Sequence, residues 1–131
     1  MIGLDTNILI RYFAQDDAKQ SAKASEIIEQ QLSKEHPAFI GSIVLVEMVW
    51  VLTRLYKMQP VDIMLIVKEL INAVDIQLEH HEETWKAHQL VLSDNLDFSD
   101  ALLGAIHHRH GCNYTLTFDR KAATSELFKA A

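Results

Sequence analysis

The sequence is poor in residues that cross-link a chain or turn it sharply. It contains one cysteine, two prolines and four glycines among 131 residues. A single cysteine excludes an intrachain disulfide, so a buried core must stabilise the fold, and a reducing cytoplasm is the expected location. The scarcity of glycine and proline argues against an all-β fold with many tight turns.

Long apolar runs are absent as well. The nearest candidate, residues 43–52, is interrupted by Glu47 and is shorter than the roughly 20 apolar residues that span a bilayer. The first residues lack the basic region and apolar stretch of a signal peptide. We therefore expect no membrane association.

Basic residues are outnumbered by acidic ones. The chain has 12 Lys and Arg against 18 Asp and Glu, a formal net charge of −6. This balance excludes broad attraction to nucleic-acid phosphates as the main binding force. Phosphate chemistry would need a metal ion or a local basic patch. An apolar fraction of 49% is typical of a globular protein, and the length predicts a single domain over residues 1–131.

Short apolar segments alternate with longer helical patterns along the chain. The expected strands are residues 1–4, 37–41, 75–79 and 113–118. The expected helices are residues 6–13, 17–34, 43–56, 61–73, 82–92, 97–110 and 120–128. Alternation of this kind predicts an α/β fold with a central, mostly parallel sheet of four or five strands flanked by helices.

Two acids come directly after expected strands, where α/β proteins place functional groups. Asp5 follows the first strand, and Asp119 follows the fourth. Each has an alternative role as a helix N-cap, because a carboxylate oxygen accepts the free N–H groups of a first helical turn. The sequence alone leaves both roles open.

Glu47 lies within the most apolar helix, and its neighbours three and four positions away are all apolar. We expect it to be buried, and a buried carboxylate costs several kcal/mol unless something compensates its charge. A metal ion would do so. The alternative is a structural ion pair with Arg54 or Arg11.

Asp97 and Asp100 stand three residues apart at the start of another helix. Asp97 is the natural N-cap, whereas Asp100 precedes small apolar residues that would press it inward. Several carboxylates near one another repel, and they are tolerated mainly where they hold hard divalent cations. Oxygen ligands without histidine or cysteine favour Mg²⁺ or Mn²⁺ over zinc.

Other reactive residues have structural interpretations. His107, His108 and His110 occupy the end of a helix, where polar side chains complement the helix dipole. Cys112 has no evident activating partner and is expected to be buried. Five cations are candidates for contacts with phosphates, although each is also an ordinary surface charge: Arg11, Arg54, Arg109, Arg120 and Lys121.

Four motifs together resemble those of the PIN-domain ribonucleases, and within that superfamily the VapC-type toxins of toxin–antitoxin pairs. They are LDTNIL at residues 4–9, VEM at 46–48, DFSDAL at 97–102 and TLTFDR at 115–120. The resemblance covers the chain from residue 2 to about residue 121. One departure is that residues 122–131 lack the clear final strand pattern of many relatives.

The resemblance implies a PIN-like three-layer fold and a metal-dependent endoribonuclease. The acidic quartet would be Asp5, Glu47, Asp100 and Asp119, with Asp97 as an additional metal ligand. Asn7 and Thr117 match polar positions that support the site. The implied cofactor is Mg²⁺ or Mn²⁺, and the products would carry 5′-phosphate and 3′-hydroxyl ends.

The resemblance also implies partners: an RNA substrate, a small antitoxin that inserts a segment into the acidic groove, and a second copy of the chain in a homodimer. Two other functions remain open. One is a non-catalytic PIN-like binding module, although such modules commonly lose acids of the quartet. The other is phosphotransfer through an aspartyl-phosphate on Asp5, although this chain has Asn7 where one such pattern requires a second aspartate.

Overall fold

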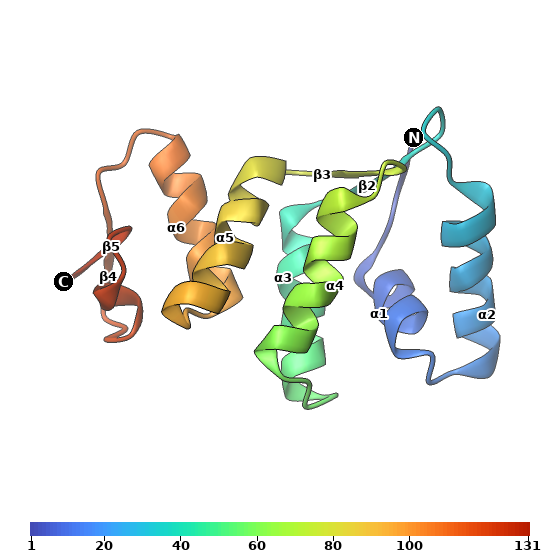
Figure 1. Cartoon of the computed structure of the whole chain (residues 1–131), viewed down its shortest axis with the longest axis horizontal. Helices are drawn as coiled ribbons and strands as arrows, with labels where there is room; N and C mark the ends of the chain where they lie inside the picture. Colours follow the sequence, from blue (N-terminus) through green and yellow to red (C-terminus); the bar gives the residue numbers. More distant parts are fainter. The chain divides into compact units, whose positions relative to one another are not determined.

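Five short strands and six α-helices follow one another along the chain, and the computed structural model describes all of residues 1–131 (Figure 1). The strands are β1 (Ile2–Gly3), β2 (Ala38–Ile40), β3 (Ile76–Leu78), β4 (Thr115–Thr117) and β5 (Phe128–Ala130). The α-helices are α1 (Thr6–Ala14), α2 (Ala18–Glu26), α3 (Ser42–Arg54), α4 (Pro60–Asn72), α5 (His81–Asp94) and α6 (Phe98–Arg109). A π-helical turn, η1 (Ile27–Gln31), continues α2, and a 3-10 turn, η2 (Ala122–Thr124), precedes β5. The chain divides into two compact units, Met1–Glu79 and His80–Ala131.

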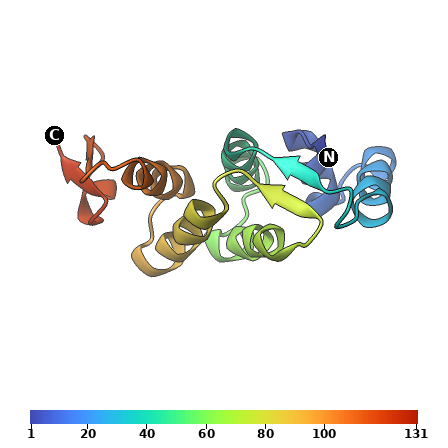
Figure 2. The ribbon, with the colours of Figure 1, turned by 90° about the horizontal axis from the view of Figure 1, so that it is seen from above.

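The first unit is built on a parallel sheet in the order β1-β2-β3. Ala38 of β2 is aligned with Ile2 of β1 on one side and with Ile76 of β3 on the other. Figure 2 shows β2 and β3 between α3 on one side and α4 on the other. Because both faces are covered, the middle strand is apolar, and Ala38 and Ile40 are fully buried.

The start of α3 is tied to the end of β3. Gly41 occupies the N-cap position and offers no side-chain acceptor, so the Ser42 N–H donates instead to Oε1 of Glu79 at 2.9 Å. The Ser42 hydroxyl also donates to the backbone oxygen of Glu79 at 3.3 Å. These bonds fix the strand–helix junction that begins the helix carrying Glu47.

The second unit packs α5 against α6 and adds a two-stranded parallel sheet, β4-β5. Gly104 of α6 permits this arrangement. A β-carbon at residue 104 would lie 2.7 Å from Cε2 of Phe128, the first residue of β5. The missing side chain therefore lets the buried Phe128 ring approach the helix backbone closely.

Parallel strands alternating with helices confirm the predicted α/β fold class, with the strands grouped as a sheet of three and a sheet of two. The four predicted strands correspond to β1–β4, and Pro60 opens α4 as expected. No helix is both long enough and apolar enough to cross a membrane.

Two expectations for the C-terminal part of the chain are wrong. Residues 120–128 do not form a helix, because the chain forms η2 and then the strand β5. β5 gives no alternating signal, since only Phe128 of its three residues is buried. Cys112, expected to be buried, is exposed in the turn after α6. A short, one-sided strand and a turn residue leave little periodic pattern for sequence reasoning to detect.

Candidate functional site

Asp5 occupies the junction between β1 and α1. Its side chain caps α1, because Oδ1 accepts the backbone N–H of Thr6 at 2.7 Å. The capping role left open by the sequence is therefore real. Oδ2 has no hydrogen bond and the residue is exposed, so one carboxylate oxygen is available to a ligand. Asn7 lies in the first turn of the same helix and is also exposed.

Glu47 is exposed on α3, so the expectation that it is buried is wrong. The reason is that its apolar neighbours do not face the core: Ile43 is 77% exposed and Trp50 is 57% exposed. The alternative ion pair with Arg11 is not formed either, because Arg11 pairs with Asp16. Within the first unit, Glu47 stands on an exposed face of α3 that is mostly apolar, and α3 packs against α1, the helix that follows Asp5.

The second unit carries the other three acids. Asp119 follows β4, and its Oδ1 accepts the backbone N–H of Ala122 at 2.8 Å. Ala122 is the first residue of η2, so this bond stabilises the start of that turn. Thr117 accepts the backbone N–H of Asp119 on its hydroxyl at 3.0 Å. The predicted supporting residue Thr117 thus holds the turn that positions Asp119.

Asp97 stands at the N-cap position of α6, but its side chain makes no capping hydrogen bond. Capping by this side chain, expected from the sequence, is therefore not its role in the structure. Asp100 lies in the first turn of the helix and is half-buried. Both carboxylates are thus free of structural hydrogen bonds.

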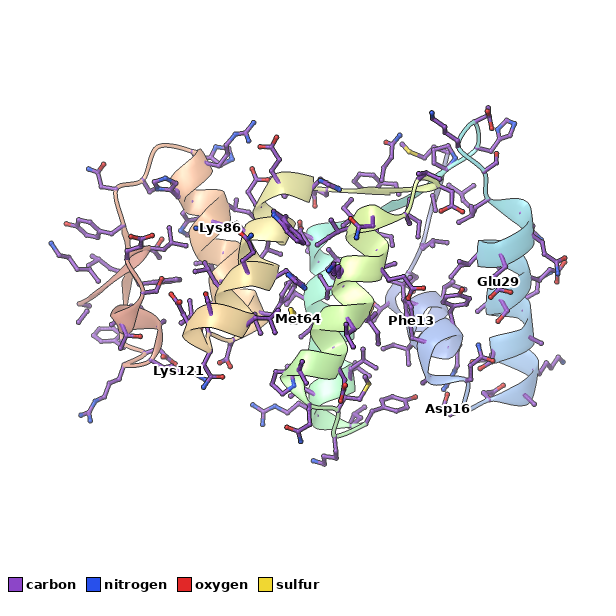
Figure 3. All side chains as sticks on the ribbon, viewed as in Figure 1. Phe13, Asp16, Glu29, Met64, Lys86 and Lys121 are labelled. Carbon is purple, nitrogen blue, oxygen red and sulfur yellow. The ribbon has the colours of Figure 1, made fainter.

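Asp97 and Asp119 act electrostatically on Asp100. Burial raises the pKa of Asp100 above its ordinary value of 3.8, and the negative charges of Asp97 and Asp119 raise that pKa further. Lys121 acts in the opposite direction; it lies beside the β4–β5 pair (Figure 3). A carboxylate crowded by two others is stabilised by an added cation, because a nearby positive charge favours its ionised form.

The chemistry of these donors fits a hard divalent cation. All the candidate ligands are carboxylates, which Mg²⁺ and Mn²⁺ prefer, and a cation would offset the charges of Asp97 and Asp119 that act on Asp100. No group of three or more acidic, histidine or cysteine side chains is placed so that it could hold a metal ion in this structure. Asp5 and Glu47 belong to the first unit, and Asp97, Asp100 and Asp119 to the second.

The polar groups at the end of α6 have partners of their own. Nδ1 of His107 lies 2.9 Å from the Thr115 hydroxyl, which joins α6 to β4. Arg109 pairs with Glu82 at 3.1 Å and with Glu83 at 3.3 Å. These contacts connect the end of α6 to β4 and to α5 within the second unit, which gives its polar residues a structural role.

The family model of the PIN domain matches residues 2–125. The chain belongs to the PIN domain family. The match runs through both compact units and includes all four motifs identified in the sequence. PIN domains are generally metal-dependent nucleases, so nuclease chemistry is the class of activity of this family. No curated protein matches the sequence.

Proposed function

We propose that this PIN domain is a metal-dependent endoribonuclease and the toxin of a toxin–antitoxin pair, acting in the cytoplasm. The observation that supports it most is the half-buried carboxyl group of Asp100, whose pKa is raised by burial and by the negative charges of Asp97 and Asp119. The charges of Asp97 and Asp119 both disfavour the ionised form of Asp100, and a bound cation would offset them. Membership of a nuclease family supplies the reaction class.

In this proposal Asp5, Glu47, Asp100 and Asp119 hold Mg²⁺ or Mn²⁺ together, and Asp97 assists. The ion supplies Lewis-acid polarisation of the phosphodiester and a water molecule of lowered pKa. Asp5 offers the carboxylate oxygen that does not cap α1. Thr117 holds the turn of Asp119, so that this carboxylate does not have to be ordered when RNA arrives.

The expected products carry 5′-phosphate and 3′-hydroxyl ends, because water rather than the 2′-hydroxyl of RNA is the proposed nucleophile. Purified protein should cleave RNA with Mg²⁺ or Mn²⁺ and lose this activity completely in EDTA. The measurement is gel analysis of a labelled RNA, with an Asp119→Asn protein purified in parallel to detect contaminating nuclease. Equal cleavage in EDTA, or 2′,3′-cyclic phosphate ends, would contradict the mechanism.

The toxin role predicts a protein partner. We expect a small antitoxin, encoded beside this chain, to bind a homodimer of it and suppress cleavage. Expression of the operon should yield a stable complex, and expression of this chain alone should arrest growth. The Asp119→Asn variant is the control, since it should be tolerated alone and still bind the antitoxin. Harmless expression of a fully active protein would contradict the toxin role.

A further inference from the structure

A groove of about 250 Å³ lies between α1 and α2 in the first unit. Its lining residues are Asn7, Ile8 and Arg11 from α1, and Gln20, Lys23 and Ala24 from α2. In each helix these residues are spaced by one, three or four positions, so they share one face. Each polar side chain of the lining carries N–H donors, and none is a carboxylate.

A second groove in the same unit has the opposite character. It is lined by Glu29, Glu69 and Asp75 together with aromatic and aliphatic side chains. The chain has more acidic than basic residues, so an average groove would be expected to contain carboxylates, as this second groove does. The groove between α1 and α2 has none among its lining residues. An anion is the ligand that suits a lining of cations and amides.

Arg11 is held in a fixed orientation at this groove. Its Nε–H donates to Oε1 of Gln20 at 2.8 Å, and Nη1 donates to Oδ1 of Asp16 at 3.0 Å. Asp16, at the turn between α1 and α2 (Figure 3), also accepts the Tyr56 hydroxyl at 2.6 Å. A guanidinium group has five N–H donors, and the bonds to Gln20 and Asp16 use two of them. Arg11 is therefore oriented by the protein and still able to donate.

Lys23 is held much less firmly. Its ammonium lies 3.4 Å from Oε2 of Glu26, and both side chains are well exposed. Exposed pairs of this kind contribute little to stability. Lys23 can therefore exchange Glu26 for an anion in the groove at small cost.

We propose that the groove between α1 and α2 binds a phosphate of the RNA backbone beside the phosphate that is cleaved. This inference rests on the proposed function, because the proposed function is what identifies RNA as the substrate. Asn7 stands two residues after Asp5, and a rise of about 1.5 Å per residue places Arg11 about 9 Å along α1 from Asp5. The groove thus provides the local basic patch that a chain of net charge −6 needs in order to hold a polyanion.

Sequence reasoning named Arg11 as a candidate but missed Gln20 and Lys23. α2 has the pattern of a solvent-facing helix, and only its packing against α1 shows that these two side chains line a groove.

The test is binding of a short, labelled single-stranded RNA of mixed sequence to the full chain, by fluorescence anisotropy in EDTA over a range of KCl concentrations. Log affinity decreases linearly with log salt concentration. For Lys23→Glu, this decrease should be less steep than in the wild type, by about 0.7–1 in the slope, for every RNA sequence. At low salt this corresponds to about tenfold weaker binding. Lys23→Arg should bind like the wild type.

Lys68→Glu is the matched control, because it makes the same charge change on an exposed helical position of the first unit outside the groove. Equal loss in both variants, unchanged binding in Lys23→Glu, or no RNA binding by the wild type would each overturn the proposal. Cleavage is assayed separately with Mn²⁺. A wild type that binds RNA through the groove and cleaves nothing would support the groove and contradict the nuclease function.

Discussion

Asp100→Asn should reduce RNA cleavage at least about 10³-fold, a loss of about 4 kcal/mol of transition-state stabilisation. The substitution keeps the shape of the side chain and removes the charge that would hold the metal ion. Asp5→Asn and Asp119→Asn should have effects of similar size, because each removes one ligand of the same proposed set. The measurement is the cleavage rate of a labelled RNA in saturating Mn²⁺.

Asp94→Asn is the matched control for Asp100→Asn. Asp94 is exposed at the end of α5, in the same unit, and bonds only to Ser93, so full activity is expected. Asp97→Asn should cost about 10- to 100-fold, the usual effect of a group that tunes a metal ligand. If Asp97→Asn proved more damaging than Asp100→Asn, the assignment of Asp100 as the principal ligand of this motif would be wrong.

The same Asp100→Asn variant should be at least as stable as the wild type when no metal is present. The pKa of Asp100 in the folded protein is raised, so the folded state binds the proton more tightly than the unfolded chain. The wild type therefore loses stability as the pH rises from the ordinary pKa of 3.8 through the raised value, and carries the full cost once Asp100 is ionised in the folded protein.

Removing that charge should raise the melting temperature at pH 7 by about 2 °C, if the partly screened cost of burial and repulsion is about 0.5 kcal/mol. Wild-type protein should gain more stability from Mg²⁺ than the variant, because the ion binds only the folded state. Melting curves with and without Mg²⁺ measure both effects. A variant that melts well below the wild type would show that Asp100 has a structural partner instead.

Gly104→Val should destabilise the protein by about 3 kcal/mol. The first side-chain atom alone would lie 2.7 Å from Cε2 and 3.0 Å from Cζ of Phe128, and 3.3 Å from Cβ of Leu127. Phe128 and Leu127 are both buried, so the ring has no free space to move into. Forcing extra carbon atoms into such a contact typically costs 1–3 kcal/mol, or more. The measurement is the free energy of unfolding in urea.

Gly3→Val is the matched control, since no atom lies within 4 Å of a β-carbon at Gly3 and valine favours strands. Its stability should be equal to the wild type or slightly higher. A double variant with Phe128→Leu should recover part of the loss caused by Gly104→Val, which a double-mutant cycle measures as coupling. If Gly104→Val and Gly3→Val were equally stable, the close approach of β5 to α6 would be contradicted.

Local sequence signals predicted the elements well where a strand or helix carries its own pattern. β1 to β4 are short segments followed closely by polar residues, and α4 opens at Pro60 as its sequence indicates. Asp5 and Asp119 were placed correctly after strands, because the end of an apolar run is visible in the sequence. The same reasoning failed for Glu47, since apolar neighbours on a helix predict burial only when another element covers them.

The sequence by itself determined the α/β class, the family and the carboxylates that are candidates for the site, because these depend on residue order and on periodicity over a few turns. The tertiary structure decided what no local pattern contains: the exposure of Glu47, the pairing of β5 with β4, and the effect of the Asp119 charge on Asp100. Each of these depends on contacts between residues distant in the chain. Burial and electrostatic fields are sums over such contacts, so they are settled only when the elements pack.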